Sequence, residues 1–543
     1  MWTADLGNGR FRNPILYADY SDPDAIRVGD DYFMISSSFS NAPAMPLLHS
    51  KDLVNWKVIN YILPEVPEFR YRNPIHGCGV WAPAIRYHEG TYYVCFPMPD
   101  EGIYMTTTTD PYGKWSRPVN IRPGAGWIDP CPFWDDDGKA YLVAGVAKSR
   151  IGYKSVLHMV EMKPDGSGLT GEEKVIFDGN LNDQITIEGP KMYKRNGWYY
   201  IFAPAGGVKT GWQTVLRSKN VFGPYDYKVV MRQGDSPVNG PHQGAWVDTV
   251  TGQDWFIHFQ DVYAAGRITH LQPMSWDNDW PVIGVRKGDE DYGEPVMEYE
   301  KPDVGAEHDI CEPDTTDEFT GESLGLQWQW NANPDNDWAE YGTDKDGRKE
   351  QGGSYIRLNA VSRVSNRPIG DYRNLLLQKW PAPEFTCEAR INISGMKPGD
   401  NAGYVSLGRK YIAIDISKAE NGKINMNAVT GIQQFDCDQA YTSETRQYIG
   451  EYTDIEDVYF RYTVKRIGTK DYVEAGLPVK NAPEEVITIE VSTDGKQYTN
   501  PVSVEAEAGR WVGVKSGLYA SHDSGILGNE SGYITADYVR YTD

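Results

Sequence analysis

The stretch Gly197-Trp198-Tyr199-Tyr200-Ile201-Phe202 combines a glycine turn with an aromatic strand, and it is one of five such copies in the chain. The other copies are Gly29-Asp30-Asp31-Tyr32-Phe33, Gly90-Thr91-Tyr92-Tyr93, Gly138-Lys139-Ala140-Tyr141 and Gly252-Gln253-Asp254-Trp255-Phe256. Gly29 and Gly252 are 252 − 29 = 223 residues apart. The four intervals average roughly 56 residues per unit, near the ~40–50 residues of a propeller blade. Because long helical patterns are missing from these units, the repeat predicts a five-bladed β-propeller.

A second regularity lies upstream of each glycine turn. The offsets run from 29 − 22 = 7 to 252 − 242 = 10 residues, and the residues found there are Asp22, Trp81, Asp129, Glu188 and His242. Equivalent positions in the blades of a ring converge on its axis, so we expect these five side chains to meet there. Three of the five are carboxylates.

Three converging carboxylates suit the cleavage of a glycosidic bond. Inversion needs a base that activates water and an acid that protonates the leaving oxygen, with the two carboxyls ~6.5–9.5 Å apart. A third carboxylate near the acid raises the pKa of the acid by like-charge repulsion and keeps it protonated near neutral pH. Considered alone, the Asp-Pro pairs at Asp22 and Asp129 are also typical of ordinary turns. Their matching offsets with Glu188 are the stronger signal.

The repeat is no longer recognisable after about Gly284, and the residue composition changes there. A stretch rich in Glu, Asp, Gly and Pro runs from Lys287 to Pro313 and is typical of a linker. Alternating patterns such as Ser354-Tyr355-Ile356-Arg357-Leu358 follow and are typical of a β-sandwich. We therefore predict an all-β chain with a propeller over residues 1–300, a linker over 301–314 and a jelly-roll type β-sandwich over 315–543.

Composition narrows the choice of partner. The chain has 543 residues and a net charge of 53 − 76 = −23 at pH 7, which argues against nucleic acid or an anionic membrane surface. No apolar run approaches the ~18–20 residues of a membrane span. A neutral sugar suits this charge, and the 36 Tyr and 17 Trp can supply stacking surfaces. The N-terminus lacks a signal-peptide pattern. We expect a cytoplasmic protein or a mature form, for example periplasmic, and leave a homo-oligomer open.

Four motifs resemble those of glycoside hydrolase family 43, and they are Ser21-Asp22-Pro23-Asp24-Ala25-Ile26, Trp81-Ala82-Pro83, Trp127-Ile128-Asp129-Pro130 and Glu188-Gly189-Pro190-Lys191. The part after Asp314 resembles the concanavalin-like sandwich of the family's β-xylosidases. The resemblance implies an inverting, exo-acting enzyme with Asp22 as base, Asp129 as pKa modulator and Glu188 as acid. One departure is Tyr-Ser-Asp-Pro-Asp around Asp22, where the xylosidases often read Asn-Pro-Asp-Pro-Ser, so substrate preference transfers less well than the base.

The resemblance also implies residues that bind substrate, namely Phe39, Trp81, His242, Gln243 and Arg267. A place in the hydrophobic core is the alternative for Phe39 and for Trp81, although the offset of Trp81 favours a sugar-facing role, and a surface salt bridge is the alternative for Arg267. His242 takes the fifth axial position, where a lone His is usually structural. Some relatives hold a divalent cation, often calcium, at this His. We expect no required cofactor and keep a structural Ca²⁺ near His242 as an open prediction.

These observations favour a glycoside hydrolase that releases non-reducing-end α-L-arabinofuranosyl or β-D-xylosyl units from hemicellulose-derived oligosaccharides or side chains. The sequence does not choose between a β-D-xylosidase and an α-L-arabinofuranosidase. A fructan hydrolase of a related five-bladed family would show Asn-Asp-Pro-Asn-Gly, Arg-Asp-Pro and Glu-Cys, where this chain has Ile128-Asp129-Pro130 and Glu188-Gly189-Pro190. A non-catalytic carbohydrate-binding protein on the same scaffold would be expected to lack one axial carboxylate.

Overall fold

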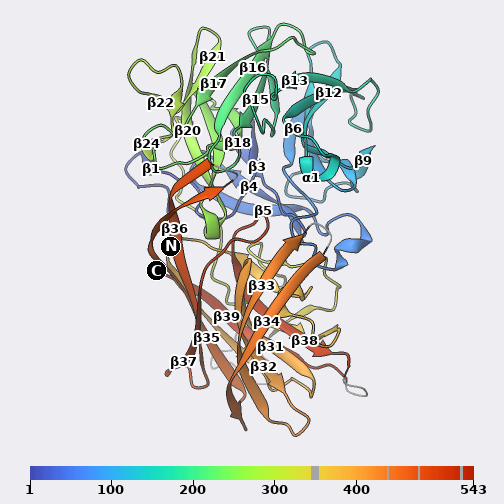
Figure 1. The fold of residues 1–543 in the computed structure, drawn as a ribbon, viewed down its shortest axis with the longest axis vertical. Coiled ribbons are helices and arrows are strands. Elements are labelled where there is room, and N and C mark those ends of the chain that lie inside the picture. The colour runs from blue at the N-terminus through green and yellow to red at the C-terminus, as the bar shows by residue number, and fades with distance from the viewer. Residues whose placement is uncertain (344–353, 437–438, 475–476, 526–529) are drawn as a thin grey trace.

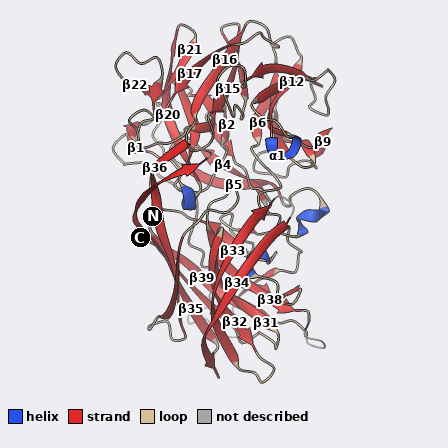
Figure 2. Ribbon diagram, in the orientation of Figure 1, coloured by secondary structure: helices blue, strands red, loops and turns tan. Residues whose placement is uncertain are grey.

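The computed structural model describes residues 1–343, 354–436, 439–474, 477–525 and 530–543. Figure 1 shows two bodies stacked along the long axis, the N-terminal one above the C-terminal one. Strands dominate both bodies (Figure 2), and helical elements such as α1 (Lys148–Ile151) are short. Within the described ranges, no helix has the length and apolar character needed to cross a membrane. The predicted all-β class, a five-bladed propeller followed by a concanavalin-like sandwich, is confirmed.

The propeller consists of antiparallel units that follow one another in chain order. In the described ranges there are five units, and their innermost strands are β2 (Asp24–Val28), β6 (Ala84–His88), β10 (Trp127–Trp134), β14 (Lys191–Arg195) and β18 (His242–Asp248). Strands β2, β6, β10 and β14 contact one another in sequence. Strand β18 contacts both the fourth unit and β2, which closes the ring.

The outer strands complete each unit. From the inside outwards they are β3 (Asp31–Ile35), β4 (Ala44–Ser50) and β5 (Trp56–Leu63); β7 (Thr91–Met98), β8 (Gly102–Thr108) and β9 (Val119–Pro123); β11 (Ala140–Val146), β12 (Val156–Met162) and β13 (Lys174–Asp178); β15 (Trp198–Ala205), β16 (Trp212–Ser218) and β17 (Asp226–Met231); and β19 (Asp254–Asp261), β20 (Arg267–Asp277) and β21 (Trp280–Ile283). Strands β22 (Val285–Arg286) and β23 (Gly293–Glu294) extend the fourth unit.

The predicted aromatic runs form the second strand of each unit, and their rings pack against neighbouring units. Phe33 of β3 lies edge-on to Tyr92 of β7, with ring centroids 5.4 Å apart. Phe202 of β15 stacks on Phe256 of β19 at 5.9 Å. Aromatic strands therefore supply the core between the units, which explains why the aromatic pattern recurs with the repeat.

The segment after the last unit first returns to the propeller. Strand β24 (Glu298–Glu300) pairs with β1 (Arg10–Arg12), and the next pairing is an isolated bridge between Asp317 and Val539 in the sandwich. The residues between Glu300 and Asp317 all lie in the described ranges, and none of them belongs to a strand. The boundaries at 300/301 and 314/315 stay predictions.

The C-terminal body is built from two large sheets. One contains β25 (Gln329–Trp330), β28 (Val361–Arg363), β29 (Leu376–Lys379), β31 (Asp400–Leu407), β32 (Lys410–Lys418), β33 (Ile424–Asp436), β34 (Gln439–Tyr452) and β38 (Lys515–Asp523). The other contains β26 (Ala339–Thr343), β27 (Ser354–Asn359), β30 (Phe385–Asn392), β35 (Asp457–Glu474), β36 (Leu477–Ser492), β37 (Thr499–Glu505) and β39 (Tyr533–Thr542). Their inner faces share one apolar core that also includes Ala264 and Ile268 of the propeller.

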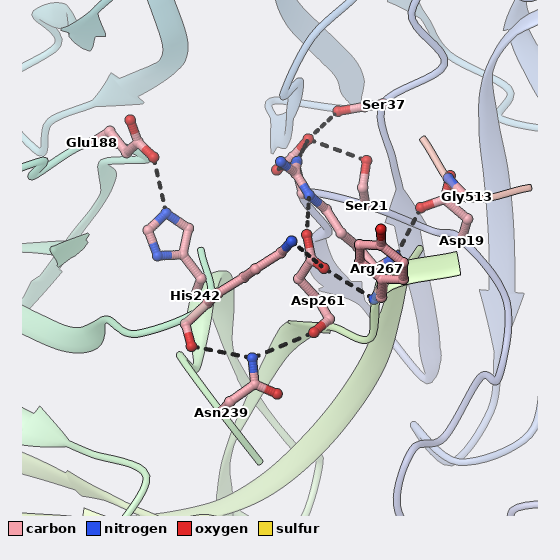
Figure 3. Close-up of polar contacts among 12 residues, drawn as sticks. Asp19, Ser21, Ser37, Glu188, Asn239, His242, Asp261, Arg267 and Gly513 are labelled. Carbon is pink, nitrogen blue, oxygen red and sulfur yellow. Dashed lines mark hydrogen bonds and ion pairs between the residues drawn. The ribbon is translucent and has the colours of Figure 1, made fainter. Parts of the chain in front are cut away.

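The sandwich touches the propeller through backbone contacts beside the propeller axis. The Val514 N–H donates to the Ala264 carbonyl at 2.7 Å. The buried Asp19 carboxylate accepts the N–H of Arg267 at 3.0 Å and that of Gly513, in the sandwich, at 2.9 Å (Figure 3). A side chain at Gly513 would place its Cβ 2.7 Å from a propeller carbonyl. Asp19 therefore joins the two bodies at a place where their backbones lie in close contact.

Replacing Asp19 by Ala should destabilise the protein. The change leaves two buried N–H groups without an acceptor, at a cost of about 1–3 kcal/mol each. We expect a lower urea midpoint for Asp19→Ala in equilibrium unfolding. The control Asp165→Ala removes an exposed carboxylate that accepts one backbone N–H, and its effect should be small. Equal midpoints for Asp19→Ala and the wild type would contradict this account of the domain contact.

Candidate active site

Asp22 and Glu188 lie just before the innermost strands of their units, whereas Asp129 lies within β10, at a bulge between Ile128 and Cys131. Asp22 and Asp129 each have a left-handed backbone with φ 54°, directly before a proline. In the fourth unit Gly189 occupies this position, with φ 60°. Glu188 therefore lies one residue earlier in its unit than the two aspartates do in theirs. Non-glycine residues held in left-handed conformations cluster at functional sites, because the surrounding fold must offset their strain.

The carboxylate of Asp22 is held by three donors. Nη1 of Arg267 donates to its two oxygens at 2.9 and 3.2 Å. The hydroxyl of Ser37 donates to Oδ2 at 2.6 Å, and that of Ser21 donates to the same oxygen at 3.2 Å. Figure 3 shows these donors together with Asp19 behind Arg267. Charge-assisted bonds of this kind orient a carboxylate and balance its charge.

Glu188 is the more accessible carboxylate. Its side chain is 25% exposed, whereas the Asp22 side chain is 6% exposed. Nε2 of His242 lies 3.0 Å from Oε1 of Glu188, and His242 is completely buried (Figure 3). His242 thus stands behind Glu188 and orients its carboxylate.

Asp129 lies beside Glu188 and is buried. Its Oδ2 accepts the N–H of Gly189 at 2.8 Å. Burial, reinforced by the neighbouring Glu188 carboxylate, raises the pKa of Asp129 to about 7. Since strongly interacting carboxyls titrate as a pair, Asp129 and Glu188 together retain one proton up to near neutral pH. The third carboxylate that the sequence predicted beside the acid is therefore itself the group with the raised pKa.

A small cavity joins these groups. It has a volume of about 170 Å³, and its walls include Phe39 and Trp81 of the propeller and Trp511 of the sandwich. The Trp81 ring centroid lies 6.4 Å from those of both Phe39 and Trp511. The volume is below the ~300–1,000 Å³ of drug-sized ligand sites, so the cavity suits one small polar ligand. Aromatic walls around hydrogen-bonding groups are suited to a sugar ring.

The structure gathers all the predicted site residues at this cavity. Those that line it are Asp22, Phe39, Trp81, Asp129, Glu188, Gln243 and Arg267. His242 does not line the cavity but bonds to Glu188 from behind. Arg267 is 7% exposed, so it is a buried partner of Asp22 and not a surface salt bridge.

Sequence reasoning missed Trp511, Ser37 and Asp19. Trp511 has a left-handed backbone with φ 65° and belongs to a different domain from the carboxylates. No motif marks it, because its place at the cavity depends on how the two domains dock. Asp19 and Ser37 act through Arg267 and Asp22, and nothing in their local sequence distinguishes them from ordinary loop residues.

A calcium ion near His242 stays a prediction. Ca²⁺ prefers six to eight oxygen ligands, whereas His242 offers a nitrogen. The described part of the chain contains no group of three His, Cys, Asp or Glu side chains that could hold a metal ion. These residues do not fit a protein-built calcium site, and we derive no chemical step through a metal.

Replacing Asp129 by Asn should stabilise the protein at high pH. A raised pKa means that the folded state binds the proton more tightly than the unfolded chain, so this contribution to stability is lost as the pH rises through about 7. A shift from 3.8 to about 7 corresponds to about 4 kcal/mol at pH 8. We expect Asp129→Asn to raise the free energy of unfolding at pH 8, with the gain shrinking towards pH 4.

Urea unfolding across this pH range measures the effect. The control Asp137→Asn changes an exposed aspartate in the turn of the same unit, and its effect should not follow this pH dependence. A gain for Asp129→Asn that is the same at every pH would contradict the raised pKa.

Comparison with known proteins shows which family the chain belongs to. The model of glycosyl hydrolases family 43 matches residues 11–281, and that of the beta xylosidase C-terminal concanavalin A-like domain matches residues 316–542. A putative beta-xylosidase of Xylanibacter ruminicola is 41% identical over 420 residues, which are 76% of this chain and 74% of that protein. The non-reducing end alpha-L-arabinofuranosidase BoGH43B of Bacteroides ovatus is 30% identical over 443 residues, 75% of each protein.

A solved structure extends the match to nearly the whole chain. The bifunctional GH43-CE protein of Bacteroides eggerthii superposes with a TM-score of 0.76 at 28% identity, covering 98% of this chain and 63% of that longer one. The chain therefore belongs to family 43 of the glycosyl hydrolases and carries the concanavalin A-like C-terminal domain of its beta-xylosidases.

Proposed function

We propose that this family 43 exo-glycosidase hydrolyses its substrate with inversion and removes α-L-arabinofuranosyl or β-D-xylosyl units from the non-reducing ends of hemicellulose-derived oligosaccharides. The observation that carries the proposal is a single small cavity lined by Asp22, Asp129 and Glu188 and walled by Trp511 of the second domain. A pocket of this size accepts the end of a sugar chain. Three carboxylates on separate rigid units supply the acid and base that hydrolysis requires.

Asp22 is the proposed general base. Arg267 and Ser37 orient its carboxylate, which accepts a proton from the attacking water. The water oxygen bonds to the anomeric carbon as the bond from that carbon to the leaving oxygen breaks. Because Arg267 is paired with Asp22, its charge also balances the buried carboxylate while the base waits for substrate.

Glu188 is the proposed general acid. It is more exposed than Asp22, and His242 holds it from behind. The proton retained by the Asp129–Glu188 pair passes from Glu188 to the leaving oxygen, so the departing sugar leaves as a neutral alcohol. Asp129 keeps that proton available near neutral pH through its repulsion of a second negative charge.

The choice of sugar is left to experiment. One similar protein is named a putative beta-xylosidase and another an alpha-L-arabinofuranosidase, and the two sugars are both pentoses of similar size. Membership in family 43 gives no support to a fructan hydrolase of a related family. The presence of all three carboxylates gives no support to a non-catalytic binding protein.

Replacing Asp22 by Asn should abolish most of the activity. Loss of a general base typically costs about 10²–10⁴-fold in rate. The measurement is release of nitrophenol from the β-D-xylopyranoside and the α-L-arabinofuranoside, with Asp30→Asn, an exposed aspartate in the turn of the same unit, as control. The glycoside that the wild type hydrolyses faster is the preferred substrate. A loss below tenfold in Asp22→Asn would mean that another group is the base.

Replacing Glu188 by Gln should affect poor leaving groups most. Nitrophenol leaves readily without a proton, whereas a sugar hydroxyl needs one. We expect kcat/KM on a pentosyl disaccharide to fall at least about tenfold further than kcat/KM on the nitrophenyl glycoside. Equal losses on the two substrates would remove Glu188 from the acid role.

A further inference from the structure

The cavity carries more positive charge than its catalytic residues require. Its charged lining consists of the three carboxylates, Arg267, Lys148 and Lys154. With one proton shared by Asp129 and Glu188, the carboxylates carry two negative charges against three cations. The charged lining therefore sums to 3 − 2 = +1, although the whole chain carries −23. Asp261 lies outside the lining with Oδ2 4.0 Å from Nε of Arg267 and offsets the charge of Arg267, so the positive charge that faces the cavity comes from the two lysines. Composition does not explain this excess, because Asp and Glu outnumber Lys and Arg in the chain.

Both lysines come from the segment between β11 and β12. Lys148 is exposed at the start of α1, and Lys154 is half-buried just after it. Figure 1 shows α1 on the side of the propeller that faces the sandwich, which is also the side from which Trp511 reaches the cavity. The lysines therefore belong to the wall of the cavity that the carboxylates also line.

Lys154 stands on the side of the proposed acid. Its Nζ donates to Oγ1 of Thr186 at 2.7 Å, and Thr186 precedes Glu188 by two residues. A general acid lies next to the oxygen that it protonates, which is the leaving-group oxygen. The sugar that departs therefore passes the part of the wall that holds Lys154.

Within the described ranges, neither lysine forms an ion pair. Among the described residues, no carboxylate oxygen lies within 4.0 Å of either lysine nitrogen. Arg150, in the same segment, shows the contrast, because its Nε lies 2.8 Å from an oxygen of Asp100. Two ammonium groups beside a ligand site that form no ion pair with a described residue attract an anion.

We propose that the leaving-group side of this cavity recognises a carboxylate, and that the preferred substrate is a pentosyl oligosaccharide whose adjoining sugar carries a uronic acid. The inference rests on the proposed function, because it assigns the leaving-group side from Glu188. Lys148 and Lys154 pair with the uronate and position the chain end. Partly exposed ion pairs contribute modestly, so each lysine should account for about a two- to fivefold preference.

The test compares two substrates that differ only in charge. One is an oligosaccharide with the cleavable pentose next to a sugar that carries glucuronic acid, and the other is its glucuronate methyl ester. We expect the wild type to show a kcat/KM ratio of acid to ester of roughly five or more at low salt. The ratio should shrink at high salt, because screening weakens exposed pairs.

The variants assign the preference to the lysines. In Lys148→Gln/Lys154→Gln the acid-to-ester ratio should approach one, with each single variant in between. The control Lys163→Gln removes an exposed lysine of the same unit that lies outside the cavity lining, and the ratio should stay at the wild-type value.

The outcomes separate the two proposals. An enzyme that cleaves the ester but shows no preference for the acid, or whose ratio is unchanged in the double variant, contradicts the uronate inference and leaves the proposed function standing. A protein that cleaves neither oligosaccharide nor either nitrophenyl pentoside contradicts the proposed function, and the inference fails with it.

Discussion

Three carboxylates meet in a buried space at one end of the propeller axis, and their mutual repulsion is the constraint on which the rest of the site depends. The site answers it in two ways. Arg267 pairs with Asp22 at 2.9 Å, so its guanidinium offsets the charge of that carboxylate. The charge of Lys191 lowers the pKa of Asp129, but burial and the Glu188 carboxylate outweigh it and raise this pKa to about 7, so the Asp129–Glu188 pair retains a proton up to near neutral pH. Different environments thus separate three carboxylates of similar chemistry, which fits the proposed roles of Asp22 as base and Glu188 as acid.

This division depends on contacts that cross the domain boundary. Asp19 binds the backbone of Arg267 and the backbone of Gly513 with its two oxygens. Asp19 therefore holds two segments together. One is the start of β20, which carries Arg267, and the other is the sandwich loop that carries Trp511. The sandwich is a structural part of the cavity, and this explains why a domain without carboxylates at the site accompanies the propeller.

Much of the fold could be predicted because each unit repeats the same turn and the same aromatic strand. The carboxylates could be predicted because equivalent positions in equivalent units converge. The exact position of Glu188 in its unit could not be predicted, because counting back from the glycine turn hides differences in strand length. In the fourth unit Gly189 takes the left-handed position that aspartates hold in two other units. Trp511 and the Asp19 contact depend on domain docking, for which a sequence pattern carries no signal.

The most direct test of the shared proton is the pH dependence of kcat/KM, which reports ionisation in the free enzyme. The account predicts that wild-type kcat/KM falls as the pH rises through about 7. It also predicts that this alkaline limb moves to lower pH in Asp129→Asn, because the variant removes the carboxyl whose pKa is raised to about 7. An alkaline limb at the same pH in both proteins would contradict the account.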